Sequence, residues 1–214
     1  MSYFVDTTII DEIVETAHVM DAKGVMNCFE GNISVKKDGL IYITPTGKPK
    51  YWLKPEFICV FDEEGNQIAG KFPVTSEFSM HKGVMEARED INCVMHSHAP
   101  FATAFALMNK PVETNSYVEF ILDHKIAEVA SFGIPGSDDI WVQVPEILQK
   151  GYNTCLLANH GCLSVGEDIN TAAGRMLSLE NCCKILTICK MHGQDPVALP
   201  QEIVDACFAY GLPE

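Results

Sequence analysis

The sequence of 214 residues lacks any apolar run long enough to cross a membrane. Its apolar runs, for example at residues 41–43 and 154–158, fall far short of the ~20 residues that a spanning helix needs. The first residues also lack the basic patch and apolar stretch of a secretion signal. Basic residues are scarce: 15 Lys and Arg face 29 Asp and Glu, giving a formal net charge of −14. Because such a surface repels phosphate backbones and anionic lipids, we expect neither nucleic-acid nor membrane binding.

Paired cysteine motifs are also missing. Nine cysteines are present, but their number is odd and no CxxC pair occurs. In a chain without a secretion signal, this pattern favours reduced, mostly buried thiols and a cytoplasmic location over a disulfide framework. A cysteine-based zinc site or a redox pair is the alternative.

No internal repeat, low-complexity tract or linker divides the chain, so we expect one domain over residues 1–214. The spacing of apolar residues predicts helices over about 7–22, 75–88, 100–108, 142–150, 168–192 and 200–208. Short β-type segments are predicted at 33–35, 40–44, 57–61, 67–69, 91–95, 155–158 and 162–165. The irregular alternation and the hairpin-type links indicate a layered α/β domain with a mixed or mostly antiparallel sheet.

Two histidines, His96 and His98, follow the strand predicted at 91–95. If the strand continues, residues i and i+2 point to the same face, with Cα atoms roughly 6.5 to 7 Å apart. Both rings can then reach one metal ion at ~2.0 to 2.1 Å. An ordinary pair of histidines at the surface or the edge of the core is the alternative.

A third histidine, His160, stands at the end of another predicted strand and is followed by Gly161. Three histidines form a full protein ligand set for a catalytic zinc ion, with the fourth position open to water or substrate. We interpret the other four histidines as ordinary: His18, His81, His124 and His192. Of these, His81 lies on a predicted helix from which it could reach the site.

Three short segments suit an anion. Thr75 and Ser76 place two hydroxyls at a predicted helix start, beside backbone N–H groups that have no helical partner. The alternative there is a plain helix cap with Glu77 in the first turn. Residues 30–32 and 44–47 combine glycine with short polar side chains, so their backbone can approach an anion closely.

The order and spacing of five blocks, at 31–34, 43–47, 75–77, 96–98 and 159–161, resemble the class II aldolase/adducin family over about residues 8–211. The resemblance is strongest to members that cleave a ketose 1-phosphate. It implies a three-layer α/β/α sandwich around a mixed, mostly antiparallel sheet. It also implies a homotetramer with its sites between subunits and a small-molecule sugar phosphate as substrate.

The resemblance further implies one zinc ion (Zn2+) per subunit, and it assigns the site residues. The metal ligands would be His96, His98, His160 and Glu77. The catalytic residues would be Glu77 as acid/base, Tyr117 acting from a neighbouring subunit, and Tyr210 on a mobile C-terminal tail. The phosphate pocket would be formed by Gly31, Asn32, Thr46, Gly47, Thr75 and Ser76.

The implied reaction is reversible cleavage of the ketose 1-phosphate to dihydroxyacetone phosphate and an aldehyde through a metal-stabilised enediolate. The alternatives are a methylthioribulose-1-phosphate dehydratase, an L-ribulose-5-phosphate 4-epimerase and an adducin-like binding module. The epimerases usually carry Asp where this chain has Glu77, and an adducin-like module would have lost the ligands. The chain departs from the family at residues 118–120 and 132–137, so the resemblance does not carry over the identity of the aldehyde.

Overall fold

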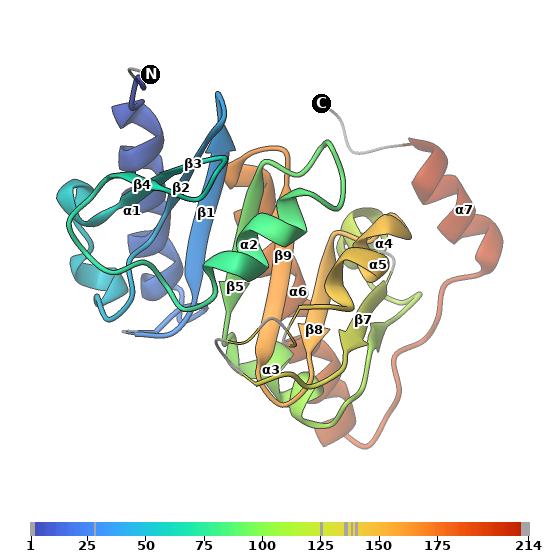
Figure 1. Ribbon diagram of the computed structural model, residues 1–214. Coiled ribbons are helices and arrows are strands. Elements are labelled where there is room, and N and C mark those ends of the chain that lie inside the picture. The colour runs from blue at the N-terminus through green and yellow to red at the C-terminus, as the bar shows by residue number, and fades with distance from the viewer. Residues whose placement is uncertain are drawn as a thin grey trace.

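A nine-stranded sheet forms the centre of the computed structural model, which describes residues 3–27, 29–124, 126–134, 137, 139 and 141–210 (Figure 1). The strand order across the sheet is β4-β3-β2-β1-β5-β9-β8-β7-β6. The strands are β1 (Asn32–Lys37), β2 (Leu40–Ile43), β3 (Cys59–Asp62), β4 (Gln67–Ala69), β5 (Cys93–Ser97), β6 (Val112–Glu113), β7 (Ile126–Ala130), β8 (Thr154–Leu157) and β9 (Gly161–Gly166).

The sheet is mixed but mostly antiparallel, because β7 and β8 are parallel while the other paired strands run in opposite directions. Local chemistry explains one of the tight connections. Between β1 and β2 the chain turns through Asp38 and Gly39, whose φ angles are 52° and 75°. A two-residue hairpin of this kind needs positive φ at both central positions, which Asp tolerates and Gly adopts freely.

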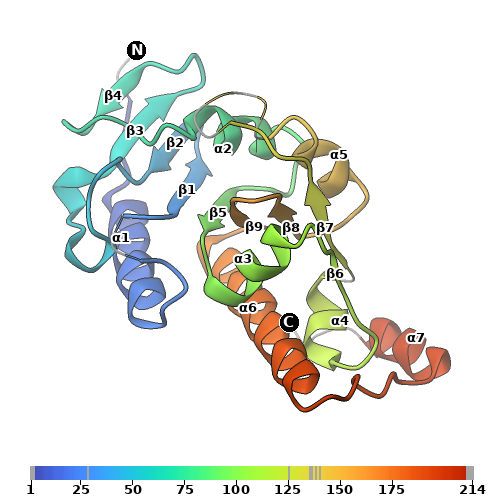
Figure 2. The ribbon, with the colours of Figure 1, turned by 90° about the horizontal axis from the view of Figure 1, so that it is seen from below.

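Helices cover both faces of the sheet, as Figure 2 shows: α2 and α5 lie on one side of the central strands, and α3 and α6 lie on the other. The helices are α1 (Thr7–Ala22), α2 (Phe78–Met85), α3 (Pro100–Leu107), α4 (Val118–His124), α5 (Val144–Gln149), α6 (Ile169–Met191) and α7 (Gln201–Tyr210), with short 3-10 turns at Lys50–Trp52 and Pro55–Phe57. Helices α1, α3 and α6 contact one face of the sheet, and α2 and α5 contact the other. The alternation along β5 matches these layers, since Met95 packs with the first group and Val94 with the second. The predicted three-layer α/β/α fold is confirmed.

Most predicted elements are present within a few residues of their expected ends. Helix α6 begins after Asp168, whose carboxylate accepts a hydrogen bond from the Thr171 backbone N–H at 2.7 Å. Strand β5 ends at Ser97, two residues later than predicted, because its pairing with β1 and β9 extends through His96. The segment between α3 and α5, which has little periodicity in sequence, contains β6, α4 and β7.

The prediction for the start of α2 is wrong. Neither Thr75 nor Ser76 caps the helix: Glu77 occupies the cap position, and no side chain makes the capping hydrogen bond. The segment before α2 instead pairs with the residues that follow β2, since Val74 forms a β-bridge with Pro45. The Thr75 hydroxyl points toward Asn32 rather than along the helix, at 3.1 Å from its side-chain amide.

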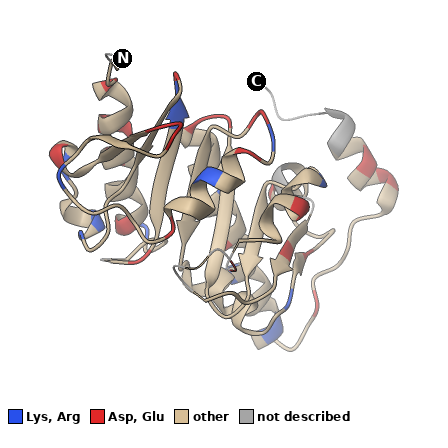
Figure 3. Ribbon diagram, viewed as in Figure 1, with Lys and Arg blue, Asp and Glu red and all other residues tan. Residues whose placement is uncertain are grey.

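The other predictions concern the cysteines, membrane-spanning helices, the charge of the chain and the number of domains. Eight cysteines are described, all of them free and six of them buried. Burial raises the pKa of the Cys155 thiol to about 12, which suits an inert core residue. Within the described residues, no helix combines the length and apolar character needed to span a bilayer. Acidic residues outnumber basic ones along the helices and loops that surround the sheet (Figure 3). A single domain over residues 1–214 stays a prediction.

Candidate active site

Strand register brings the functional residues to one end of the central strands. In the antiparallel pairing of β1 with β5, Asn32 at the start of β1 lies opposite His96 near the end of β5. In the pairing of β5 with β9, Ser97 lies opposite Cys162, one residue after the start of β9. The start of β1, the end of β5 and the turn before β9 therefore meet at the same end of the sheet.

The three predicted histidine ligands converge there. The ring of His96 lies 4.9 Å from that of His98 and 4.7 Å from that of His160, measured between ring centroids. The Nε2 atoms of His96 and His98 are 3.1 Å apart. One nitrogen from each of the three rings lies within 4.8 Å of the others.

Hydrogen bonding and burial set the state of these rings. His96 Nδ1 lies 3.0 Å from the carbonyl oxygen of Cys162, so Nδ1 must carry the proton and donate it, and Nε2 keeps a free lone pair. Burial lowers the pKa of His96 to about 3 and also lowers the pKa of His160. Both rings are therefore neutral near pH 7, which is the form that binds a metal ion. His160 Nδ1 is buried and has no hydrogen-bond partner among the described residues.

The turn that carries His160 depends on its neighbours. Asn159 adopts a positive φ of 56°, and the backbone N–H of His160 donates to the carbonyl of Leu157 at 3.0 Å. Next to the histidine, a Cβ atom on Gly161 would lie 2.5 Å from the carbonyl oxygen of Ser97 and 3.0 Å from Cδ2 of His98. Only glycine therefore allows this turn to approach β5 so closely.

Glu77 completes the cluster. Its Oε2 lies 3.5 Å from His96 Nε2, and its Oε1 lies 3.5 Å from His160 Nε2. Ligands at ~2.0 to 2.1 Å from a tetrahedral zinc ion are about 3.3 Å apart, which is close to these separations. Three neutral imidazoles and one carboxylate are a donor set that suits zinc, so the residues present fit a metal ion of this kind.

The carboxyl group of Glu77 is buried yet favours its ionised form. Burial opposes ionisation, but the His96 ring, the hydrogen bond from Asn32 and the His160 ring together hold the pKa of Glu77 below its ordinary value. The hydrogen bond from Asn32 Nδ2 to Glu77 Oε2 measures 2.7 Å. Glu77 is thus placed as an anionic group facing the histidines.

The segments predicted to bind phosphate lie next to this cluster. Asn32 Nδ2 donates to Thr75 Oγ1 at 3.1 Å, and the backbone N–H of Thr46 donates to the carbonyl of Pro73 at 3.1 Å. These contacts join the first segment in chain order to Thr75 and place residues 44–47 beside Pro73, two residues before Thr75. Three of the residues predicted to bind phosphate are exposed and therefore accessible to a ligand: Thr46, Gly47 and Ser76.

Thr75 and Asn32 differ in what they can offer a phosphate. Thr75 Oγ1 accepts hydrogen bonds from Asn32 Nδ2 and, at 3.4 Å, from the backbone N–H of Glu77. Its own hydroxyl proton therefore stays free to donate. Both amide protons of Asn32, in contrast, are used inside the protein, on Thr75 and Glu77.

The two predicted catalytic tyrosines are not brought to the histidines by any contact in the described residues. Tyr117 precedes α4, and its hydroxyl accepts a hydrogen bond from Asn181 Nδ2 of α6 at 2.8 Å. Tyr210 is the last residue of α7, and its side chain lies outside the described residues, as does that of His124.

Sequence reasoning missed two side chains near the cluster. His81, interpreted as ordinary although its helix could reach the site, is fully buried and hydrogen-bonds to Asn32 through Nε2. Its position four residues after Glu77, one helical turn further along the chain, was the available signal. Glu30 places Oε2 3.7 Å from His98 Nδ1 and is held there by Asn27, and only its proximity to Gly31 in sequence pointed to it.

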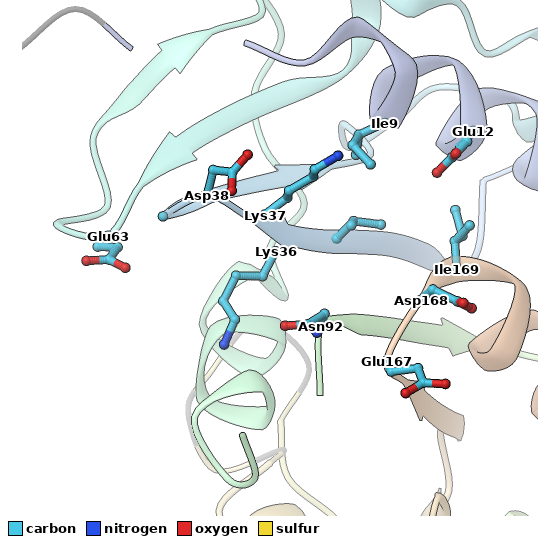
Figure 4. A pocket seen from close by; sticks show the side chains of 12 residues that line it. Ile9, Glu12, Lys36, Lys37, Asp38, Glu63, Asn92, Glu167, Asp168 and Ile169 are labelled. Atoms are coloured by element: carbon cyan, nitrogen blue, oxygen red, sulfur yellow. The ribbon is translucent and has the colours of Figure 1, made fainter. Parts of the chain in front are cut away.

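A separate cavity of about 480 Å³ lies at the other end of β1 (Figure 4). Its lining includes Lys36, Asp38 and Asp168 but none of the predicted site residues. Because Asn32 begins β1 and Lys37 ends it, this cavity is remote from the histidine cluster. The two features do not form one site.

Known proteins share this architecture. A family model described as the class II aldolase and adducin N-terminal domain matches residues 11–187. An L-fuculose phosphate aldolase of Methanococcus maripaludis is 34% identical over 186 residues, covering 86% of this chain and 99% of that protein. A 5-methylthioribulose-1-phosphate/5-deoxyribulose-1-phosphate aldolase of Rhodospirillum rubrum is 25% identical, covering 89% of this chain and 85% of that protein. A solved L-fuculose 1-phosphate aldolase matches with a TM-score of 0.89 at 27% identity, covering 98% of this chain and 99% of that one.

The fold and the histidine centre are those of a metal-dependent lyase of the class II aldolase type. The chain belongs to the class II aldolase and adducin family. The predicted family and enzyme class are confirmed. A binding module without catalysis would have no need of three converging histidines beside a carboxylate, so the adducin-like alternative is disfavoured.

We predict that Gly161→Ala weakens zinc binding at least tenfold, because the added methyl group must push the His160 turn away from β5. The matched control is Gly174→Ala in α6, where a Cβ atom meets nothing within 4 Å. This control should bind zinc normally and be as stable as the wild type or slightly more so. Competition with a chelator measures both affinities, and equal zinc affinity in the two folded variants would contradict the prediction.

Proposed function

We propose that this protein is a zinc-dependent aldolase that reversibly cleaves a ketose 1-phosphate, similar to L-fuculose 1-phosphate, to dihydroxyacetone phosphate and an aldehyde. The observation that carries the proposal is the convergence of His96, His98 and His160 with the carboxylate of Glu77. These four side chains would hold one zinc ion per subunit. When bound, the ion would act as a Lewis acid on the negative charge that develops as the C3–C4 bond breaks.

Glu77 has the proton-transfer role. Its ionised form is favoured in the resting protein, so it can act as a base when it is not engaged as a ligand. We assign to it the transfer of the proton at C3 of dihydroxyacetone phosphate, in either direction. Glu77 is the only carboxylate within 4 Å of two of the three histidines among the described residues.

The phosphate group would be held without a basic side chain. The proposed pocket uses the Thr75 hydroxyl proton and backbone N–H groups near two glycines, Gly31 and Gly47, both with positive φ. The exposed residues Thr46 and Ser76 add further hydroxyls, and Asn32 forms the inner wall. Hydroxyls and free N–H groups bind phosphate oxygens directly, so no lysine or arginine is needed in this pocket.

Assembly and location extend the proposal. We propose a homotetramer in which Tyr117 serves a neighbouring subunit's site and Tyr210 contributes from a mobile C-terminal tail. Free, mostly buried thiols fit the proposed cytoplasmic location. The proposed ligand is a small sugar phosphate, not a nucleic acid or a membrane.

Product analysis is the experiment that tests the activity. The zinc-loaded protein is incubated with L-fuculose 1-phosphate, 5-deoxyribulose 1-phosphate and 5-methylthioribulose 1-phosphate, the last two chosen because of the Rhodospirillum rubrum relative. An aldolase releases dihydroxyacetone phosphate from at least one of them. A dehydratase releases water and keeps all carbons in one product. An epimerase converts its pentulose 5-phosphate to the other epimer without releasing a fragment. Either result would replace the proposal.

We predict that Glu77→Gln binds dihydroxyacetone phosphate but exchanges its C3 proton with deuterated water ~10² to 10⁴-fold more slowly than wild type. The amide keeps the shape of the side chain and removes the base. NMR of the exchanging proton measures the rate, and metal analysis confirms that the variant is loaded. Wild-type exchange in a folded, loaded variant would remove Glu77 from the proton transfer.

We predict that inactive Tyr117→Phe and inactive His96→Ala chains regain activity when co-assembled, because one intact site then forms between subunits. The matched control mixes His96→Ala with His160→Ala, which lose ligands of the same centre and should remain inactive. Activity is measured on purified mixed oligomers. No recovery in the first mixture would mean that both residues serve a single subunit's own site.

A further inference from the structure

A buried chain of polar side chains runs from the sheet to Glu77. Ser34 Oγ lies 2.6 Å from Nδ1 of His81, and Nε2 of His81 contacts Oδ1 of Asn32. The other end of the Asn32 amide donates to Glu77 at 2.7 Å. All four side chains are buried, with exposed fractions of 7% or less. The chain therefore lies out of reach of solvent from end to end.

The fold accounts for this arrangement. Asn32 and Ser34 are two residues apart in β1, so both project to the same face of the sheet. That face is the one covered by α2, which carries His81, while Glu77 is the cap residue of α2. Strand alternation brings Asn32 and Ser34 to one face, and one helical turn brings Glu77 and His81 to one side of α2. Two pairs of residues from distant parts of the sequence thus form one hydrogen-bonded chain.

The direction of every hydrogen bond in this line follows from the charge of Glu77. An ionised carboxylate can only accept, so Asn32 must turn its NH2 group toward Glu77 and its oxygen toward His81. His81 must then donate from Nε2, which leaves Nδ1 as an acceptor for the Ser34 hydroxyl. Burial lowers the pKa of His81 to about 4, so the ring holds one proton only, as this assignment requires.

We propose that Asn32 and His81 are positioning residues that fix the Glu77 carboxylate against the three histidines. The inference rests on the proposed zinc site and gives Asn32 a second role beside its place in the proposed phosphate pocket. In the resting arrangement, the side-chain NH2 group of Asn32 donates to both Thr75 and Glu77. His81 touches no reacting group and acts through Asn32.

The first test is spectroscopic and uses the metal-free wild-type protein. Long-range ¹H–¹⁵N correlation spectra of the histidine rings distinguish a proton on Nε2 from one on Nδ1. We expect the proton of His81 on Nε2. A proton on Nδ1 would reverse the hydrogen bond to Asn32 and overturn the proposal, whatever the variants do.

The second test measures affinities for zinc and for inorganic phosphate. We expect His81→Leu and Asn32→Leu each to weaken zinc binding 10- to 100-fold, the usual loss when the partner of a metal ligand is removed. The double variant should bind zinc no more weakly than either single variant, because both break the same chain. The phosphate affinity of zinc-loaded His81→Leu should stay within about twofold of wild type, because His81 is not part of the proposed phosphate pocket.

The matched control is His81→Gln, whose amide can donate to Asn32 and accept from Ser34, and it should restore most of the zinc affinity. Thermal unfolding verifies that each variant is folded. Unchanged zinc affinity in folded His81→Leu would overturn the proposal. If wild type binds zinc and the variants weaken it, yet no ketose phosphate is cleaved, the proposed function fails and the positioning role stands.

Discussion

The register between β1 and β5 is the constraint on which the site depends. Because Asn32 lies opposite His96, the start of β1 is fixed beside the histidine cluster. The pairing of β5 with β9 then sets the position of the His160 turn. A shift of one residue in the first pairing would turn Asn32 and Ser34 to the opposite face, away from α2. Ile33 and Val35 of β1 are buried in the apolar cluster on one face of the sheet, and β5 contributes to the clusters on both faces. Because a shift would expose these residues, the hydrophobic core also determines the geometry of the polar site.

The electrostatics of the site combine two opposing demands. Under the proposed function, a protein with a net charge of −14 would admit an anionic sugar phosphate, and it also keeps a carboxylate ionised in a buried position. The histidine rings and the Asn32 amide supply the interactions that favour the Glu77 carboxylate at short range, where solvent screening is weak. The net charge of the whole chain therefore says little about whether a negative charge is favoured at the Glu77 position.

The sequence was sufficient for features set by local geometry. His96 and His98 were predicted as a pair because strand alternation alone places both rings on one face. The role of His81 was not predictable in this way, because its partners lie 47 and 49 residues earlier in the chain and meet it only after α2 packs on β1. The start of α2 was misplaced for a similar reason, since tertiary contacts of Thr75 replaced the expected local cap. The segment with β6, α4 and β7 was missed because its apolar residues follow no clear period.

The four side chains of the proposed metal site come from three separate segments: the residues before α2, the end of β5 and the turn between β8 and β9. An unfolded chain cannot hold these segments together, so a metal ion bound there would select the native state. By mass action, a ligand present at 100 times its dissociation constant adds about 2.7 kcal/mol to the free energy of unfolding. The centre would then act as a removable cross-link between distant parts of the sheet, and the resistance of the whole domain to unfolding would vary with the supply of the ion.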